Sequence, residues 1–588
     1  MRARVSVILA LGLFIAAFAV LPALAEWPAT GRELTAAIRD QQLPQITTDG
    51  SSGAIVAWQD SRDAKTTIFA RRVLATGELD PAWPVDGLRV LGDVTALASE
   101  FDGQTLPVIV SDGGGGAIIA WQDGRSQVTG LDIFAQHVLR SGVVDPAWPA
   151  DGLGLCTVRG DQQLPRIASD GTGGAIVTWM DGRSAVTGPD IFAQHVLGSG
   201  VVDPNWPANG AALSTAPAAQ SLPDIATDGA GGAIVTWQDL RTGTPDADIF
   251  AQHVKSSGVV DPAWPADGRA LTLAPGTQVN PTIVADGLHG AIVAWEDARD
   301  GLNHIFAQHV TANGAIAPGW AANGLAVSTA SGGERQPLIV SDGAAPGAVG
   351  SGAIVTWQDP RSGTSHDPFV HHILPTGSVD PAWPVNGRAL SASNAEETDA
   401  SIVGDGLGGA IVAWEEDPFV FVSHVRASGQ LDPTFPFGGQ RVRSIASFQR
   451  APSLVAAGSG GAIVTWADND PNRDANVFAM IVLTEATLGV EPSSTGPGLA
   501  LTRSGPSPAR GALTLSFALP HAAAVKLSIY DASGRRVREL VNDVEASGAH
   551  GVTWDLRDER GERLPAGVCF ARLEVEGHAL SEKLVMLR

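Results

Sequence analysis

Histidines within a repeated heptapeptide are the first residues whose type and spacing could support chemistry. An imidazole can bind a metal ion or transfer a proton near neutral pH. The peptide DIFAQHV occurs three times unchanged and the near-copy HIFAQHV once: Asp132–Val138, Asp190–Val196, Asp248–Val254 and His304–Val310. Histidine stands at six equivalent positions: His137, His195, His253, His309, His372 and His424. The first copy has Arg72 there and the last has Ile481.

A second recurring pattern is an arginine two residues after an aspartate, following a repeated tryptophan. Planar guanidinium groups suit the carboxylate or sulfate of an anionic ligand. Four of these arginines are therefore candidate ligand-binding residues: Arg125, Arg183, Arg241 and Arg299. The alternative is a local ion pair with the preceding aspartate that shapes the loop. The last two copies lack the pair, which argues against a symmetric site.

An acidic segment near the end of the repeats, DNDPNRDAN, alternates oxygen-bearing side chains as calcium loops do. The candidate ligands are Asp468, Asp470, Asn472 and Asp474. However, Arg473 stands where such a loop needs glycine, and no glutamate closes it. The alternative is a solvated acidic loop. Calcium is the one cofactor that the sequence suggests.

Motifs of established enzyme classes do not occur in this sequence. GxSxG, HExxH and CxxC are missing. A propeller glycosidase of the sialidase type needs a tyrosine nucleophile, and the single tyrosine, Tyr530, lies near the C-terminus. Carboxylates on loops could still perform acid–base catalysis. The sequence leaves catalysis open and favours a protein that is not an enzyme.

Eight tryptophans mark eight copies of one sequence unit, and the candidate histidines, arginines and acidic residues lie within these copies. The tryptophans end segments similar to GGAIVTW and stand 52 to 63 residues apart: Trp58, Trp121, Trp179, Trp237, Trp295, Trp357, Trp414 and Trp466. Each unit contains four short segments of strand character, separated by glycine, proline and aspartate. Four strands per unit, repeated eight times, are typical of a β-propeller.

The two ends of the repeat region complement each other. The segment WPATGRELT at 27–35 copies the fourth part of a unit, and the eighth unit stops at Asn476–Leu483 without that part. We therefore predict an all-β fold, an eight-bladed β-propeller closed by the N-terminal strand. Equivalent histidines in neighbouring blades would lie on the order of 10 Å apart, whereas zinc ligands lie about 2 Å from the metal. We interpret these histidines as packing residues between blades.

The connection between the second and third strands is the part of the unit whose length varies freely, and such loops on a rigid scaffold commonly bind ligands.

Export is predicted from the N-terminus and from the charge. Residues 1–25 have the basic start, apolar run and Ala23-Leu24-Ala25 end of a signal peptide. No later segment has the roughly 18 apolar residues of a membrane span. The net charge is −24, with 62 acidic and 38 basic residues, which disfavours nucleic acid as a partner. We expect a secreted or outer-surface protein with no transmembrane segment after signal cleavage.

The domain boundaries follow from where the repeats stop. We predict a propeller over 26–484, a linker rich in proline, serine and glycine over 485–498, and a small Ig-like β-sandwich over 499–588. In this last region polar and apolar residues alternate in segments such as LTLSFALP, AVKLSIYDASGRRVREL and GVCFARLEV.

The C-terminal region resembles the FlgD-like immunoglobulin fold that serves as the type A sorting domain of type IX secretion cargo. The matching positions are Tyr530, Gly534, Arg535, Trp554, Gly567, Lys583 and Arg588. Cys569 departs from the pattern, because the family usually has tyrosine there. The resemblance implies the type IX secretion machinery as a partner. The repeats resemble bacterial propeller-like repeats whose role is not generally known, which indicates architecture only.

These observations lead to one expected function and two alternatives. We expect a secreted or surface-displayed, non-catalytic binding or adhesion module whose loops bind an extracellular glycan or protein. The first alternative is a carbohydrate-active hydrolase or lyase that uses loop carboxylates. The second is a structural surface component without a small ligand.

Overall fold

The computed structural model describes most of the chain after the predicted signal peptide. The described residues are 27–28, 30–63, 65–91, 103–126, 128–243, 246–343, 351–361, 363, 365–443, 447–458, 460–469, 474–484, 500–504, 513–519, 523–531, 535–545, 548–564, 567–575 and 578–586. The predicted signal peptide, residues 1–25, and the predicted linker, 485–498, lie outside them. The chain divides into two compact units, Met1–Leu488 and Gly489–Arg588.

Every regular element among the described residues is a β-strand, and all strand pairs are antiparallel. The expectation of an all-β chain is confirmed. None of the described residues forms a helix long and apolar enough to cross a membrane.

In the part of unit 1 that the structure describes, the strands form eight sheets, which we number 1 to 8 along the chain. The first strands are β2 (Gln41–Thr48), β6 (Gln104–Ser111), β10 (Gln162–Ser169), β14 (Gln220–Thr227), β18 (Gln278–Ala285), β22 (Arg335–Ser341), β27 (Glu397–Gly404) and β31 (Phe448–Ala456). The second strands are β3 (Ala54–Asp60), β7 (Ala117–Ser126), β11 (Ala175–Asp181), β15 (Ala233–Asp239), β19 (Ala291–Asp297), β23 (Ala353–Asp359), β28 (Ala410–Glu416) and β32 (Ala462–Asn469).

The third strands carry the repeated heptapeptide, and the fourth strands are short. The third strands are β4 (Thr67–Val73), β8 (Gly130–Val138), β12 (Asp190–Val196), β16 (Asp248–Val254), β20 (His304–Val310), β24 (Asp367–Leu374), β29 (Phe419–Val425) and β33 (Asn476–Val482). The fourth strands are β5 (Leu88–Arg89), β9 (Leu153–Cys156), β13 (Ala211–Ser214), β17 (Arg269–Ala270), β21 (Leu325–Ser328), β26 (Arg388–Ala389), β30 (Gln440–Arg441) and, in sheet 8, β1 (Arg32–Glu33). Sheet 6 has an additional strand, β25 (Ser378–Val379).

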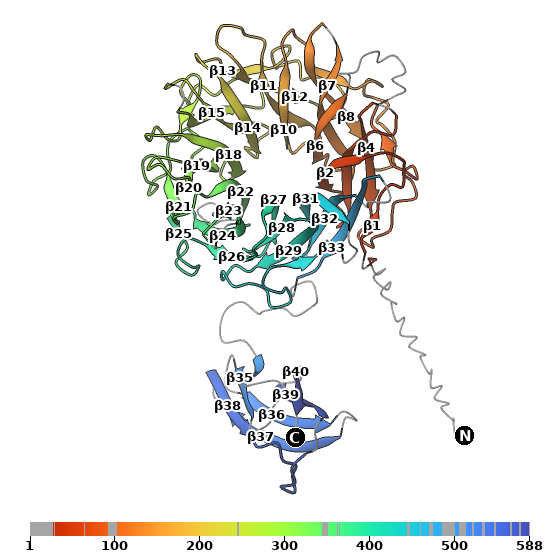
Figure 1. Ribbon diagram of the computed structural model, residues 1–588, viewed down its shortest axis with the longest axis vertical. Helices are drawn as coiled ribbons and strands as arrows, with labels where there is room; N and C mark the ends of the chain where they lie inside the picture. The colour runs from red at the N-terminus through yellow and green to blue at the C-terminus, as the bar shows by residue number, and fades with distance from the viewer. Residues whose placement is uncertain are drawn as a thin grey trace, which may run out of the picture. The chain divides into compact units, whose positions relative to one another are not determined.

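The N-terminal strand β1 pairs with β33, so that Arg32 lies opposite Ala479 and Glu33 opposite Phe478. Figure 1 shows the first strands of the sheets nearest the centre of the unit. The second strands are buried on both faces, because their AIV-W residues pack against both neighbouring sheets.

Unit 2 contains two sheets. One has β34 (Ala500–Ser504), β35 (Leu513–Leu519) and β38 (Gly548–Trp554). The other has β37 (Arg536–Glu545), β36 (Ala523–Asp531), β39 (Gly567–Val575) and β40 (His578–Met586). Alternating apolar residues of both sheets form one core that includes Leu515, Leu527, Trp554 and Leu573. This arrangement agrees with the predicted Ig-like sandwich.

Candidate functional site

A strained backbone position recurs in the first strand of every sheet. Each of these strands contains a β-bulge, and the residue there has φ between 45° and 55°. The eight residues are Leu43, Leu106, Leu164, Leu222, Asn280, Gln336, Asp399 and Ala451. None of them is glycine, so this left-handed conformation costs energy that neighbouring contacts must offset.

A side chain from the preceding sheet provides one such contact. In five sheets, the residue after the strand tryptophan accepts a hydrogen bond from the backbone N–H of the bulge residue in the next sheet. Gln59 binds Leu106 N–H at 2.8 Å, and Gln122 binds Leu164 N–H at 3.0 Å. The same bond joins Gln238 to Asn280, Glu296 to Gln336, and Glu415 to Ala451. We call it the inter-sheet bond.

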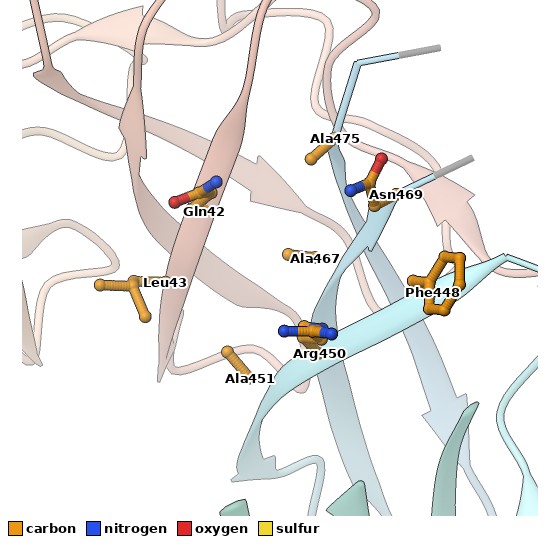
Figure 2. Close-up of a pocket in the computed structure, with 8 residues that line it drawn as sticks. All are labelled: Gln42, Leu43, Phe448, Arg450, Ala451, Ala467, Asn469 and Ala475. Carbon is orange, nitrogen blue, oxygen red and sulfur yellow. The ribbon is translucent and has the colours of Figure 1, made fainter. Parts of the chain in front are cut away.

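The junction between sheets 8 and 1 lacks this bond because Ala467 occupies the glutamine position. A pocket of about 470 Å³ lies there, shown in Figure 2, which we call the seam pocket. Its lining residues are Gln42, Leu43, Phe448, Arg450, Ala451, Ala467, Asn469 and Ala475. Asn469 and Ala475 flank the connection between the second and third strands of sheet 8, a loop of the variable kind.

The seam pocket combines an aromatic ring, amides and a cation. The Phe448 side chain is 42% exposed and Leu43 is 39% exposed. The guanidinium of Arg450 forms no ion pair with any carboxylate that the structure describes. The side-chain amides of Gln42 and Asn469 likewise have no hydrogen-bond partner among the described residues. These groups are available to a ligand that has apolar and negatively charged parts.

Glu415 adjoins the seam pocket through its bond to Ala451 N–H. Burial, together with the charges of Asp399 and Asp417, raises the pKa of the Glu415 carboxyl to about 7, although the bond from Ala451 N–H and the charge of Arg450 oppose the shift. A carboxyl with such a pKa can donate a proton near neutral pH. The same position holds glutamine in sheets 1, 2, 4 and 6, so the side chain also has a structural use.

The first strands of sheets 3 to 7 line a second pocket, of about 390 Å³, near the centre of unit 1. Arg166 and Asp224 face each other there with 3.8 Å between guanidinium and carboxylate. Burial raises the pKa of Asp224, and its carboxylate accepts the backbone N–H of Ile283 at 3.1 Å. This carboxylate already has two partners and joins sheets 3, 4 and 5.

The four predicted ligand-binding arginines all have partners within unit 1. The guanidinium of Arg125 binds both oxygens of Asp123, and Arg183 and Arg299 pair in the same way with Asp181 and Asp297. The guanidinium of Arg241 binds one oxygen of Asp239, and the other oxygen accepts the backbone N–H of Arg241. Each guanidinium also lies 3.8 to 4.0 Å above a phenylalanine ring. These contacts match the local ion pair; binding of an anion by the four arginines stays a prediction.

The aspartates of these pairs also accept the indole N–H of the repeated tryptophans, as Asp239 does from Trp237 at 2.8 Å. In sheet 8 no arginine follows the aspartate, and Arg443 from another segment binds Asp468 at 2.9 Å instead. It lies 4.2 Å above Phe478, as its counterparts do above their rings. The arrangement is therefore restored by a residue at a different sequence position.

The repeated histidines are each held by aspartates. His253 Nε2 lies 2.9 Å from Asp228, and its Nδ1 lies 2.9 Å from Asp261. His137, His195, His372 and His424 have the same two kinds of partner, and Arg72 binds Asp49 and Asp80 in sheet 1. The histidines are buried parts of the scaffold. Only one partner is present for His309.

The candidate calcium ligands are only partly described. Asp468 binds Arg443 and Trp466, and Asp474 accepts the backbone N–H of Arg39 at 2.6 Å. Asp470 and Asn472 lie outside the described residues. Among the residues that are described, no group of three or more histidine, cysteine or acidic side chains could hold a metal ion. Calcium binding by this loop stays a prediction.

The residues of the predicted sorting motif lie in unit 2. Tyr530 lies opposite Phe570 in the β36–β39 pair, and Gly567 begins β39. Trp554 is buried and donates its indole N–H to Arg557 O, while Arg535 pairs with Asp531. Lys583 lies in β40. Gly534 and Arg588 fall outside the described residues.

The seam pocket residues Gln42, Phe448 and Arg450 were not predicted from the sequence. A signal for them exists: when the repeats are aligned on tryptophan, Ala467 replaces the recurring glutamine. Its meaning becomes clear only once the partner of that glutamine, the bulge N–H of the next sheet, is known.

Comparison with solved structures finds distant similarity. An ulvan lyase of polysaccharide lyase family PL25, bound to -[GlcA(1-4)Rha3S]-, is 10% identical, with 76% of this chain and 94% of that chain covered and a TM-score of 0.41. The α-L-arabinofuranosidase Arb93A from Fusarium graminearum is 12% identical, with 55% and 92% covered and a TM-score of 0.32. A protein of unknown function from Dyadobacter fermentans is 8% identical, with 66% and 97% covered and a TM-score of 0.33.

Comparison of the sequence with curated proteins found no match. A protein family does match within unit 2, over residues 506–573, and that family is the FlgD Ig-like domain. The match includes Tyr530, Trp554 and Gly567, and the strands β35 to β38 with most of β39. The chain therefore carries a FlgD Ig-like domain at its C-terminal end.

Proposed function

We propose that this protein is an exported binding protein whose seam pocket holds an acidic glycan. In this proposal residues 26–484 form an eight-bladed β-propeller closed by β1, and residues 499–588 are a sorting domain for type IX secretion. The observation that supports binding most directly is the guanidinium of Arg450, which has no carboxylate partner among the described residues and lies beside the exposed ring of Phe448 in the seam pocket.

An acidic sugar suits each group of the pocket. A guanidinium binds a carboxylate or sulfate through two parallel hydrogen bonds. An aromatic ring packs against the apolar face of a sugar, and amides bind hydroxyl groups. The net charge of −24 opposes long-range attraction of an anion, so recognition depends on close contacts.

Binding measurements with the purified protein test this proposal. We expect uronic-acid or sulfated oligosaccharides to bind and neutral ones of equal length not to bind. Arg450→Ala should weaken binding at least tenfold, about 1.4 kcal/mol. Arg140→Ala is the matched control, because it removes the same charge from an exposed side chain in a connection of sheet 2. Equal binding by both variants, or preference for neutral oligosaccharides, would contradict the proposal.

A carbohydrate-active hydrolase or lyase is the second candidate, because Glu415 has a pKa near 7 beside the same pocket. In this case Glu415 acts as a proton donor on the bound glycan. Glu415→Gln keeps the inter-sheet bond that glutamine makes in sheets 1 and 2, so the fold should be retained. Product formation that Glu415→Gln abolishes while binding persists favours the enzyme. Binding without any product favours the binding protein.

The sorting role of unit 2 rests on the FlgD Ig-like match together with the resemblance of its end, Lys583 to Arg588, to the sorting domains. In a host with type IX secretion, we expect the full chain outside the outer membrane and a chain lacking 499–588 in the periplasm. Equal export of both chains would contradict this role.

A further inference from the structure

A carboxylate between the third and fourth strands is held by two partners in six of the sheets. One partner is a nitrogen of the third strand, the Nδ1 of a histidine or, in sheet 1, the guanidinium of Arg72, at 2.8 to 2.9 Å. The other is the backbone N–H two residues after the aspartate, at 2.8 to 3.0 Å. The aspartates are Asp80, Asp145, Asp203, Asp261, Asp380 and Asp432.

Sheet 5 keeps the histidine and lacks the carboxylate. Ala317 stands at the aspartate position, where its backbone N–H still binds His309 O as its counterparts do. The Nε2 of His309 lies 2.8 Å from Asp286. Its Nδ1 is buried and has no hydrogen-bond partner among the described residues. The second donor of the other sheets is not preserved, because Gly319 has a φ of 90° and the turn at 317–320 is of type II, which reverses the peptide that carries the Gly319 N–H.

A cavity of about 780 Å³ opens at this place. His309, Ala317 and Asp286 line it, together with the connection 311–318 and with Pro375 and Thr376 of sheet 6. His309 itself is 6% exposed, and its Nδ1 is a buried polar atom of a residue that lines the cavity. A buried polar atom without a hydrogen-bond partner is destabilising, and a ligand group that bonds to it would remove this cost.

We propose that this cavity binds the carboxylate group of a ligand, which takes the place of the missing aspartate side chain beside His309 Nδ1. In five other sheets the equivalent Nδ1 lies 2.8 to 2.9 Å from an aspartate carboxylate, and this recurring contact defines the ligand chemistry. The cavity volume accommodates an organic acid of the size of a sugar acid.

This site is independent of the seam pocket. The seam pocket adjoins the connection between second and third strands of sheet 8, whereas His309 lies opposite Ile292 near the other end of the sheet-5 strands. A variant that abolishes binding at one site should therefore leave the other unchanged.

The test replaces the missing group in the full-length protein. Ala317→Asp places the carboxylate that the other sheets have, so it should fold and fill the site. The measurement is the ¹⁵N chemical shift of histidine side chains during titration with sodium acetate and, in a second series, sodium glucuronate. In the wild type we expect one histidine to shift with saturation. In Ala317→Asp the shift should be lost or need at least tenfold more acid.

The reverse variant gives the positive control. Asp261→Ala removes the equivalent carboxylate in sheet 4, so we expect a second histidine, His253, to respond to acetate. A response to acetate and glucuronate identifies a carboxylate site; a response to glucuronate alone identifies one that needs the sugar as well. The proposal is overturned if neither acid shifts a wild-type histidine, if glucose acts as well as glucuronate, or if Ala317→Asp responds like the wild type.

Discussion

Sheets 4 and 8 have residues of opposite character at the histidine position of the third strand and at its aspartate partner: charged or polar residues in sheet 4 and apolar residues in sheet 8. In sheet 4 the imidazole of His253 lies between the carboxylates of Asp228 and Asp261. In sheet 8 the histidine position holds Ile481 and the position of Asp228 holds Ala457. Both Ile481 and Ala457 pack in the same apolar cluster. Charged groups that depend on one another have been lost together, and no buried charge remains without a partner.

Sheet 5 differs from both, because it has lost one member of the set. His309 and Asp286 remain and the second aspartate does not. The junction of sheets 8 and 1 shows the same partial loss, since the bulge of sheet 1 is present and its glutamine partner is not. Complete sets, or sets lost completely, indicate scaffold. In these two places the incomplete set lies beside a cavity, which makes each a candidate ligand site. The junction of sheets 3 and 4 also lacks the glutamine, because Met180 takes its place.

The largest effect is expected from breaking a complete set. Asp228→Ala leaves His253 and the N–H groups of Ala230 and Gly232 without their acceptor. We expect a loss of about 2–4 kcal/mol in the free energy of unfolding, because buried polar groups become unpaired. Chemical denaturation of the wild type and the variant measures this loss.

The double variant Asp228→Ala with His253→Ile copies sheet 8 and serves as the control. It should be more stable than the sum of the two single variants predicts by at least about 1 kcal/mol. Additive losses would show that the two side chains contribute to stability independently. They would contradict the conclusion that sheet 8 lacks both residues because each depends on the other.

A smaller and pH-dependent effect is expected at Glu397 in sheet 7. Burial and Asp367 raise its pKa from 4.5 to about 9. The unfolded chain loses this proton above pH 4.5 and the folded chain keeps it up to about pH 9, so stability falls as the pH rises between these values. Glu397→Gln, the residue of sheets 1 to 5, should leave stability unchanged at pH 4 and raise it by about 1–3 kcal/mol at pH 8. Thermal unfolding at both pH values measures the difference; an equal effect at both would contradict it.

Removing one inter-sheet bond should cost less. Gln59→Ala makes the junction of sheets 1 and 2 resemble the junction of sheets 8 and 1, and it leaves Leu106 N–H without its acceptor. We expect a loss of about 1 kcal/mol. Gln122→Ala, which breaks the same bond to Leu164, is the matched variant and should lose a similar amount. Losses below 0.3 kcal/mol in both would show that solvent replaces the bond.

The smallest change in stability is expected from adding the missing inter-sheet bond at the junction of sheets 8 and 1. Ala467→Gln supplies the acceptor that sheets 1 and 2 have and should add about 0.5 kcal/mol. It also fills part of the seam pocket, so binding of acidic oligosaccharides should weaken at least tenfold. Unchanged binding would place the ligand elsewhere.

The strands and sheets were predictable because each repeat carries the same local signals. The AIV-W segments are β-branched and aromatic, and glycine and aspartate mark the turns, so eight copies support one another. The FlgD Ig-like domain was recognisable from residues such as Trp554 and Gly567 that match a family in order. The pairing of the aspartates with the repeated arginines was also foreseen as an alternative, because the two residues are close in sequence.

The candidate site was not predictable, because its contacts join residues that are far apart in the chain. Arg443 replaces the arginine of sheet 8 from just after the fourth strand of sheet 7, at a position where other repeats have small residues such as Ser214 and Thr272. In five sheets the glutamine or glutamate after the tryptophan has its partner 36 to 47 residues later, in the next sheet. Ala317 and Ala467 are ordinary residues by type. They indicate a site only when compared with the aspartate and glutamine that hold a bond in the other sheets.

The pairing of β1 with β33 has a consequence for the order of assembly. The side chains of Glu33 and Asn476 bond across 443 residues, and closing a loop of that length costs roughly 5 kcal/mol of chain entropy. During synthesis from the N-terminus, β1 has no partner until the eighth repeat is complete, while seven earlier sheets can form from local contacts. A chain stopped before Asn476 would leave an open strand edge on sheet 8, and premature termination should therefore yield aggregating fragments rather than smaller stable versions of the protein.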